Sequence, residues 1–121
     1  MVKAIIKRMH SPDILNLREY THSSNEPFSF LLQMMISPSN QQGEESFDVI
    51  VRNPTPIEQG LMTENIVFHN GSLLVDTFNW KEVELFLKDF VSSLRGRNWD
   101  ELALQIDKVA SWEFRDYQEI V

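Results

Sequence analysis

The stretch FSFLLQMMI (residues 28–36) decides the fold of this chain of 121 residues. Apolar residues occupy every second position from Phe28 to Ile36, and the polar residues Ser29 and Gln33 fall between them. Successive side chains of a β-strand point to opposite faces of the sheet. The stretch therefore predicts a strand with one buried face, and it has about half the length of a membrane span.

Further strands are expected on both sides of this stretch. Residues 2–6 and 47–51 repeat the alternation of apolar and polar side chains. Residues 66–69 and 72–75 flank Asn70-Gly71, a dipeptide that tolerates the positive φ angles of a type I′ turn. We therefore predict a tight hairpin there and an antiparallel arrangement of most strands.

The helix starts are marked by Thr55, Asn79 and Asn98, each of which precedes a glutamate by three residues. Such a capping side chain accepts a hydrogen bond from an unpaired N–H of the first turn, and the glutamate reaches back. Apolar residues recur at helical spacing after Asn79 and Asn98, and Gly96 offers a C-terminal stop between the two helices. The order of strands and helices predicts a single α+β domain (residues 1–121): a mainly antiparallel sheet of four to five strands with a C-terminal pair of amphipathic helices packed on one face.

Composition narrows the functional classes. The absence of cysteine excludes a disulfide framework, thiolate zinc sites and a cysteine nucleophile. Lysine and arginine interrupt residues 1–8, which argues against a signal peptide, and we expect a cytoplasmic protein with no membrane partner. The formal charge of −7 argues against nucleic acid as a ligand and favours a basic protein partner. The four glycines are isolated, so we expect no nucleotide cofactor.

Glu44, Glu45 and Asp48 place three carboxylates at the mouth of one strand, where Glu44 and Asp48 would share a face that Glu45 does not. They favour a solvated acidic edge that attracts a basic protein surface. The alternative is a Ca²⁺ or Mg²⁺ site in a small metal-dependent hydrolase that also uses a histidine. A serine–histidine–aspartate set built from His10 or His69 also stays open, although no nucleophile motif supports it.

The segment Ser111-Trp112-Glu113-Phe114-Arg115-Asp116-Tyr117 is unusually aromatic for a stretch so near the chain end. If it is extended, Trp112 and Phe114 share one face. Either that face closes over the helices or the sheet edge, or Trp112 and Tyr117 are anchors for a partner, since these residue types are enriched at binding hot spots. The sequence leaves both alternatives open.

Four segments together resemble the immunity protein 8 family: Lys3–Arg8, Phe28–Gln33, Gly43–Val51, and Trp112-Glu113-Phe114 followed by Asp116-Tyr117. Proteins of this family are the antitoxin partners in bacterial polymorphic toxin and contact-dependent inhibition systems. The resemblance implies a non-enzymatic inhibitor that binds a cognate toxin domain in the cytoplasm.

We therefore predict an immunity protein that neutralises a toxin by steric occlusion, and a homo-oligomeric structural subunit is a further alternative. The predicted partner-binding residues are the acidic and aromatic ones singled out above: Glu44, Glu45, Asp48, Trp112, Glu113, Asp116 and Tyr117. The sequence does not indicate an oligomeric state.

Overall fold

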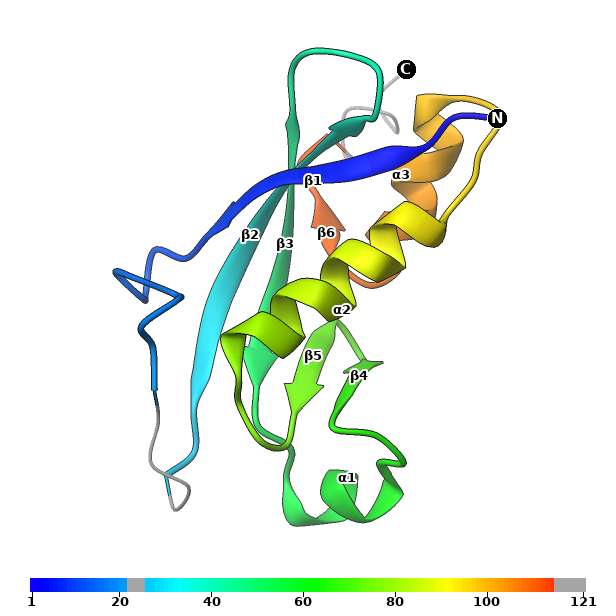
Figure 1. Cartoon of the computed structure of the whole chain (residues 1–121). Coiled ribbons are helices and arrows are strands. Elements are labelled where there is room, and N and C mark those ends of the chain that lie inside the picture. Colours follow the sequence, from blue (N-terminus) through cyan, green and yellow to red (C-terminus); the bar gives the residue numbers. More distant parts are fainter. Residues whose placement is uncertain (22–25, 115–121) are drawn as a thin grey trace.

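A computed structural model describes residues 1–21 and 26–114 and shows a six-stranded mixed sheet with helices (Figure 1). The predicted α+β class is confirmed. The strands are β1 (Ala4–His10), β2 (Ser29–Pro38), β3 (Glu45–Arg52), β4 (Ile66–His69), β5 (Ser72–Val75) and β6 (Ser111–Trp112). The helices are α1 (Pro56–Leu61), α2 (Trp80–Ser93) and α3 (Trp99–Asp107).

The strand order is β1-β2-β3-β5-β4, and β6 pairs with β3 on the same side as β5. The pairs β1–β2, β2–β3 and β4–β5 are antiparallel, as expected for strands joined by hairpins or a loop. The pair β3–β5 is parallel, because the chain passes through α1 and β4 before it returns beside β3. Within the described residues, no helix has the length and apolar character to cross a membrane.

The predicted hairpin between β4 and β5 is present. Asn70 has a φ of 47° and Gly71 a φ of 78°, the two positive angles that a type I′ turn requires. This turn pairs His69 with Ser72 and thereby sets the register of the hairpin.

All three predicted helix starts are present, although their capping boxes differ. Thr55 and Glu58 form the complete box, in which each side chain bonds the backbone of the other residue. At α3, Asn98 accepts the Glu101 N–H at 2.8 Å, but the Glu101 carboxylate turns to the Arg97 guanidinium at 2.9 Å. Glu58 also binds a guanidinium, that of Arg52, but its carboxylate accepts the Thr55 N–H at 2.9 Å as well.

Gly96 has a different role from the one predicted. Helix α2 already ends at Ser93, and Gly96 exchanges backbone hydrogen bonds with Val2 at 2.7 and 3.3 Å. A Cβ atom on Gly96 would lie 3.1 Å from both the Asn98 carbonyl oxygen and the Leu102 nitrogen. The glycine therefore permits a close approach of segments of the chain, and it does not terminate the helix in a left-handed turn.

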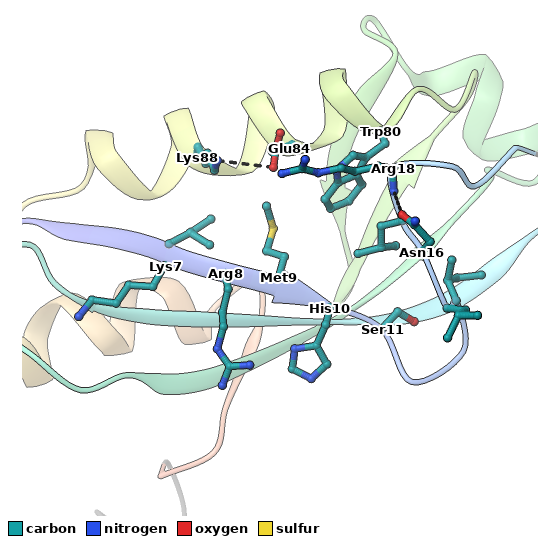
Figure 2. Close-up of a pocket in the computed structure, with 14 residues that line it drawn as sticks. Lys7, Arg8, Met9, His10, Ser11, Asn16, Arg18, Trp80, Glu84 and Lys88 are labelled. Atoms are coloured by element: carbon teal, nitrogen blue, oxygen red, sulfur yellow. Dashed lines mark hydrogen bonds and ion pairs between the residues drawn. The ribbon is translucent and has the colours of Figure 1, made fainter.

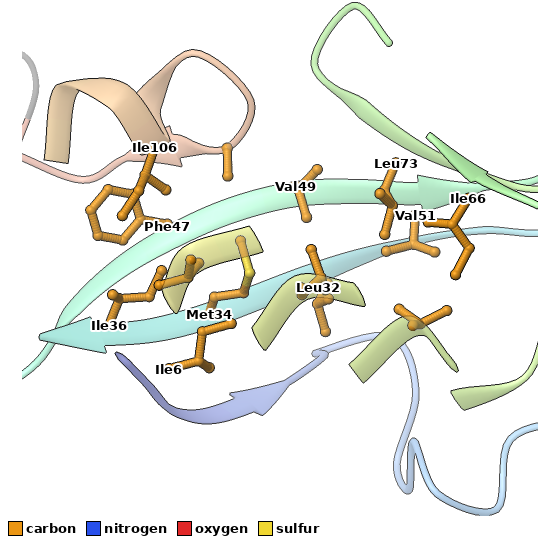
Figure 3. Packing of buried hydrophobic residues seen from close by; sticks show 14 of the residues in the cluster. Ile6, Leu32, Met34, Ile36, Phe47, Val49, Val51, Ile66, Leu73 and Ile106 are labelled. Atoms are coloured by element: carbon orange, nitrogen blue, oxygen red, sulfur yellow. The ribbon is translucent and has the colours of Figure 1, made fainter. Parts of the chain in front are cut away.

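The inner face of the sheet carries the core (Figures 1 and 3). Alternate residues of the strands pack there against one side of α2 and of α3. Burying one aliphatic side chain of this size stabilises a fold by about 1.5–3 kcal/mol. The completely buried members include Leu32, Ile36, Phe47, Val51, Leu73, Val83, Leu87, Val91, Leu102 and Ile106.

The intervening strand residues form what we call the outer face. In the described part of the chain, α1 is the helix that contacts this face, through Arg52 and beside Leu74. A shift in register between Ile6 and Arg8 changes which side chains of β1 point outward. By register and alternation, the outer face comprises Arg8, His10, Leu31, Gln33, Met35, Ser46, Asp48, Ile50, Arg52, Val67, His69, Ser72 and Leu74.

Candidate functional site

Trp112 belongs to the core. Strand β6 places it opposite Phe47, and the two rings stack with centroids 6.1 Å apart and an interplanar angle of 8°. Its side chain is only 3% exposed, and the indole Nε1–H donates to the Glu45 carboxylate at 3.1 Å. For Trp112 the structure shows the first of the two alternatives, burial at the sheet edge.

Glu113 follows directly and is anchored by the backbone of β3. Its N–H donates to the Ser46 carbonyl oxygen at 3.1 Å, and its carboxylate accepts the Ser46 N–H at 2.6 Å. The next residue, Phe114, is 39% exposed. The predicted site residues Asp116 and Tyr117 lie outside the described residues.

Glu44 forms an ion pair with Arg8 of β1. The Arg8 guanidinium donates to Glu44 Oε1, with nitrogen–oxygen distances of 2.8 and 2.6 Å. The hydrogen bond from Arg8 holds the pKa of the Glu44 carboxyl below its usual range. Arg8 was missed by the sequence analysis because no local pattern connects it to a residue 36 positions away.

Glu45 and Asp48 point to opposite sides of β3, as the alternation of strand residues predicted. Glu45 reaches the buried Trp112 on the inner side, whereas Asp48 on the outer face accepts the Ser46 hydroxyl at 3.1 Å. Glu45 thus turns away from Glu44 and Asp48, and no group of three histidine or acidic side chains among the described residues could hold a metal ion. The metal-dependent alternative consequently finds no support in this geometry.

We call Glu44, Glu45, Asp48 and Glu113 the acidic end of the molecule. The four carboxylates surround the end of β3 that adjoins the β2–β3 hairpin. One of them is neutralised by Arg8, and the others bond neutral donors. This arrangement provides hydrogen-bond acceptors and negative charge at one end of the sheet.

Among the described residues, the contacts of His69, Asp76 and Ser11 do not form the serine–histidine–aspartate set considered in the sequence. His69 Nε2 lies 3.7 Å from Glu58 Oε2, while Asp76 accepts a hydrogen bond from Gln59 at 2.8 Å. Ser11 accepts the Asp13 N–H at 3.0 Å. These contacts are those of caps and surface turns.

An ion pair between Arg52 and Glu58 joins β3 to α1. The two terminal guanidinium nitrogens, Nη1 and Nη2, each donate to the Glu58 carboxylate at 2.8 Å. The Thr55 N–H adds a third bond at 2.9 Å. The hydrogen bonds from Arg52 lower the pKa of Glu58 most, and the bond from the Thr55 N–H lowers it further, from 4.5 to about 2. The capping pattern predicted the Thr55 contact, but nothing in the sequence indicated Arg52.

A cavity of about 370 Å³ lies between β1, the following loop and α2 (Figure 2). Met9 and Trp80 point into it from opposite sides, and Glu84 bonds Lys88 at its rim at 3.5 Å. Arg8 points away from this space, toward the acidic end. The cavity therefore lies on the helix side of the sheet and is separate from the predicted site.

A sequence profile of the family described as immunity protein 8 matches residues 4–117. The chain belongs to the immunity protein 8 family. This confirms the resemblance seen in the sequence, and the match includes every residue of the acidic end. Searches of curated proteins and of solved structures returned no significant match. Membership in the immunity protein 8 family implies an immunity protein directed against a toxin, and a toxin is accordingly the implied partner.

Proposed function

We propose that this immunity protein 8 member is a non-enzymatic inhibitor that binds its cognate bacterial toxin domain in the cytoplasm and neutralises it by steric occlusion. The family match over residues 4–117 carries the proposal. The turn of Glu45 away from Glu44 and Asp48 supports it, because the three carboxylates do not converge on one point where a metal ion could bind.

The acidic end is the proposed electrostatic part of the interface. With a formal charge of −7, the chain attracts a basic partner over a long range and so accelerates encounter. Glu44, Glu45, Asp48 and Glu113 contribute here, and the proposal extends to Asp116 and Tyr117. Trp112 supports this site from within: its stacking on Phe47 holds β6 in place and thereby positions Glu113.

The experiment is co-expression with the candidate toxin domain encoded by the adjacent gene, followed by co-purification and a growth assay. A stoichiometric complex together with restored growth is the expected result. If both proteins are folded and yet form no complex and restore no growth, the proposal fails for that pair. Restored growth without a complex would contradict the occlusion mechanism, because occlusion requires a stable complex.

A further inference from the structure

Helix α1 exposes its apolar side chains. None of its residues is buried, and Ile57 and Leu61 are 80% and 76% exposed. Residues four apart lie on the same side of a helix, so the two side chains form one apolar ridge. Isolated surface aliphatics are common, whereas these two side chains form a small contiguous apolar patch.

Polar contacts hold α1 in place. The Thr55 box starts the helix, the Arg52–Glu58 ion pair attaches it to β3, and Gln59 Nε2 donates to Asp76 at 2.8 Å. Short helices are normally stabilised by packing of an apolar face against the core. In α1 that face is directed to solvent, so Ile57 and Leu61 are dispensable for attaching the helix.

A small notch lies between α1 and the hairpin β4–β5. Its volume is about 160 Å³, and its apolar lining comes from Leu61, Met62, Val67, Phe68 and Leu74. Leu74 is 2% exposed, yet it alternates with the core residues Leu73 and Val75 and faces the other side of the sheet. An apolar cavity of roughly 150 Å³ is large enough to hold a benzene molecule. The notch therefore has the size of one apolar side chain.

We propose that this notch, together with the apolar ridge of Ile57 and Leu61 that adjoins it through Leu61, receives an apolar anchor side chain of the toxin, on a segment that also carries lysine or arginine. The inference rests on the proposed function and adds the surface and the chemistry of its partner. Apolar anchors that enter well-packed pockets dominate the energetics of most protein interfaces.

Charge selects a basic partner over a second copy of this chain. Asp76 contacts α1 through Gln59, and Glu58 lines the notch while it is paired with Arg52. A second copy would bring the same acids and the same charge of −7 to the contact, and like charges oppose such pairing. A cationic segment would instead be attracted.

The notch and the acidic end lie at the two ends of one surface. They are joined along the outer face of β3 by Asp48, Ile50 and Arg52. The β2–β3 hairpin adjoins one end of β3, and α1 adjoins the other end (Figure 1). A strand of this length spans about 25 Å. An interface of ordinary size, about 800 Å² per partner, is about 30 Å across. One toxin domain can therefore cover both.

The experiment measures binding of the adjacent-gene toxin domain to the full chain by calorimetry or surface plasmon resonance. The double variant Ile57→Ala/Leu61→Ala is expected to weaken binding by at least about tenfold without lowering the melting temperature. The matched control is Leu85→Ala, an exposed leucine on α2 that is expected to leave affinity unchanged. Amide hydrogen exchange on the wild-type complex provides a readout independent of any variant, with protection expected at residues 57–63 and 67–74.

Two results would overturn the inference in distinguishable ways. If the wild-type protein binds the toxin but the double variant binds equally well and residues 57–63 gain no protection, the notch is outside the interface and the proposed function stands. If the wild-type protein does not bind the toxin, the proposed function fails and the inference fails with it.

Discussion

The two faces of the sheet use the same strands in opposite ways. On the inner face, alternate side chains of β2 and β3 are buried against α2 and α3. On the outer face, the residues between them are polar or partly exposed, and α1 offers aliphatic side chains to solvent. The buried core thus lies on one face of the sheet, and most of the side chains that we propose for toxin recognition lie on the other. Substitutions on the outer face should therefore alter binding without removing the core.

The largest expected effect comes from Trp112. Trp112→Ala should destabilise the fold by about 3–5 kcal/mol, because it leaves a cavity beside Phe47 and removes the donor to Glu45. Denaturant unfolding measures this change. Toxin affinity, measured at a temperature where the variant is folded, should change much less. Unchanged stability with a large loss of affinity would instead make Trp112 a contact residue and would break the division between the faces.

Leu32 and Leu31 are neighbouring residues of the same type on opposite faces of β2, so their substitution compares the two faces directly. Leu32 is completely buried on the inner face, whereas Leu31 is partly exposed on the outer one. Leu32→Ala should cost about 2–5 kcal/mol of unfolding free energy, and Leu31→Ala about 1 kcal/mol. Equal costs would show that the outer face is covered by part of the chain itself.

Neutralising the acidic end should change the rate of association with the toxin more than its dissociation rate. Glu44→Gln with Asp48→Asn should slow association by about tenfold or less at low salt, and the difference should shrink as salt rises. The control variant, Glu19→Gln with Asp89→Asn, removes the same charge elsewhere. Equal slowing by both variants would mean that net charge, and not the acidic end, steers the partner.

A smaller effect concerns the ion pair under α1. Arg52, and after it the Thr55 N–H, lowers the folded-state pKa of Glu58 from an ordinary value of 4.5 to about 2. The ionised Glu58 therefore stabilises the fold fully above pH 4.5, and this stabilisation is lost as pH falls toward 2. Arg52→Met should return the pKa toward 4.5 and flatten the stability profile across that window. A carbon-detected NMR titration of Glu58 measures the pKa, and denaturant unfolding at several pH values measures the stability profile.

The corresponding variant Arg8→Met at the acidic end sharpens this comparison. Its pair with Glu44 is more exposed, with the arginine side chain 60% accessible against 26% for Arg52. The acid sensitivity of stability should therefore change less than in Arg52→Met, since solvent screens exposed pairs. A larger change in Arg8→Met would place the more important ion pair at the acidic end.

The strands and helix starts were predictable because their signals are local. The alternation in residues 28–36, the Asn70-Gly71 turn and the caps at Thr55, Asn79 and Asn98 all act within a few residues. Gly96 was misassigned because its requirement comes from contact with Val2, which is distant in sequence. The three acidic residues of the β3 region were recognised as a cluster, but their divergent directions became certain only with the strand in place.

The sequence by itself determined the fold class, the main strands and helices, and the family, since each of these depends on periodicity or on motifs in chain order. Tertiary structure alone decided that Trp112 is buried, that Arg8 and Arg52 pair with Glu44 and Glu58, and that an apolar notch faces away from the core. The physical reason is that burial and ion pairing depend on which strands become neighbours. That choice is made by long-range packing, in which residues 67 positions apart, such as Glu45 and Trp112, come into contact.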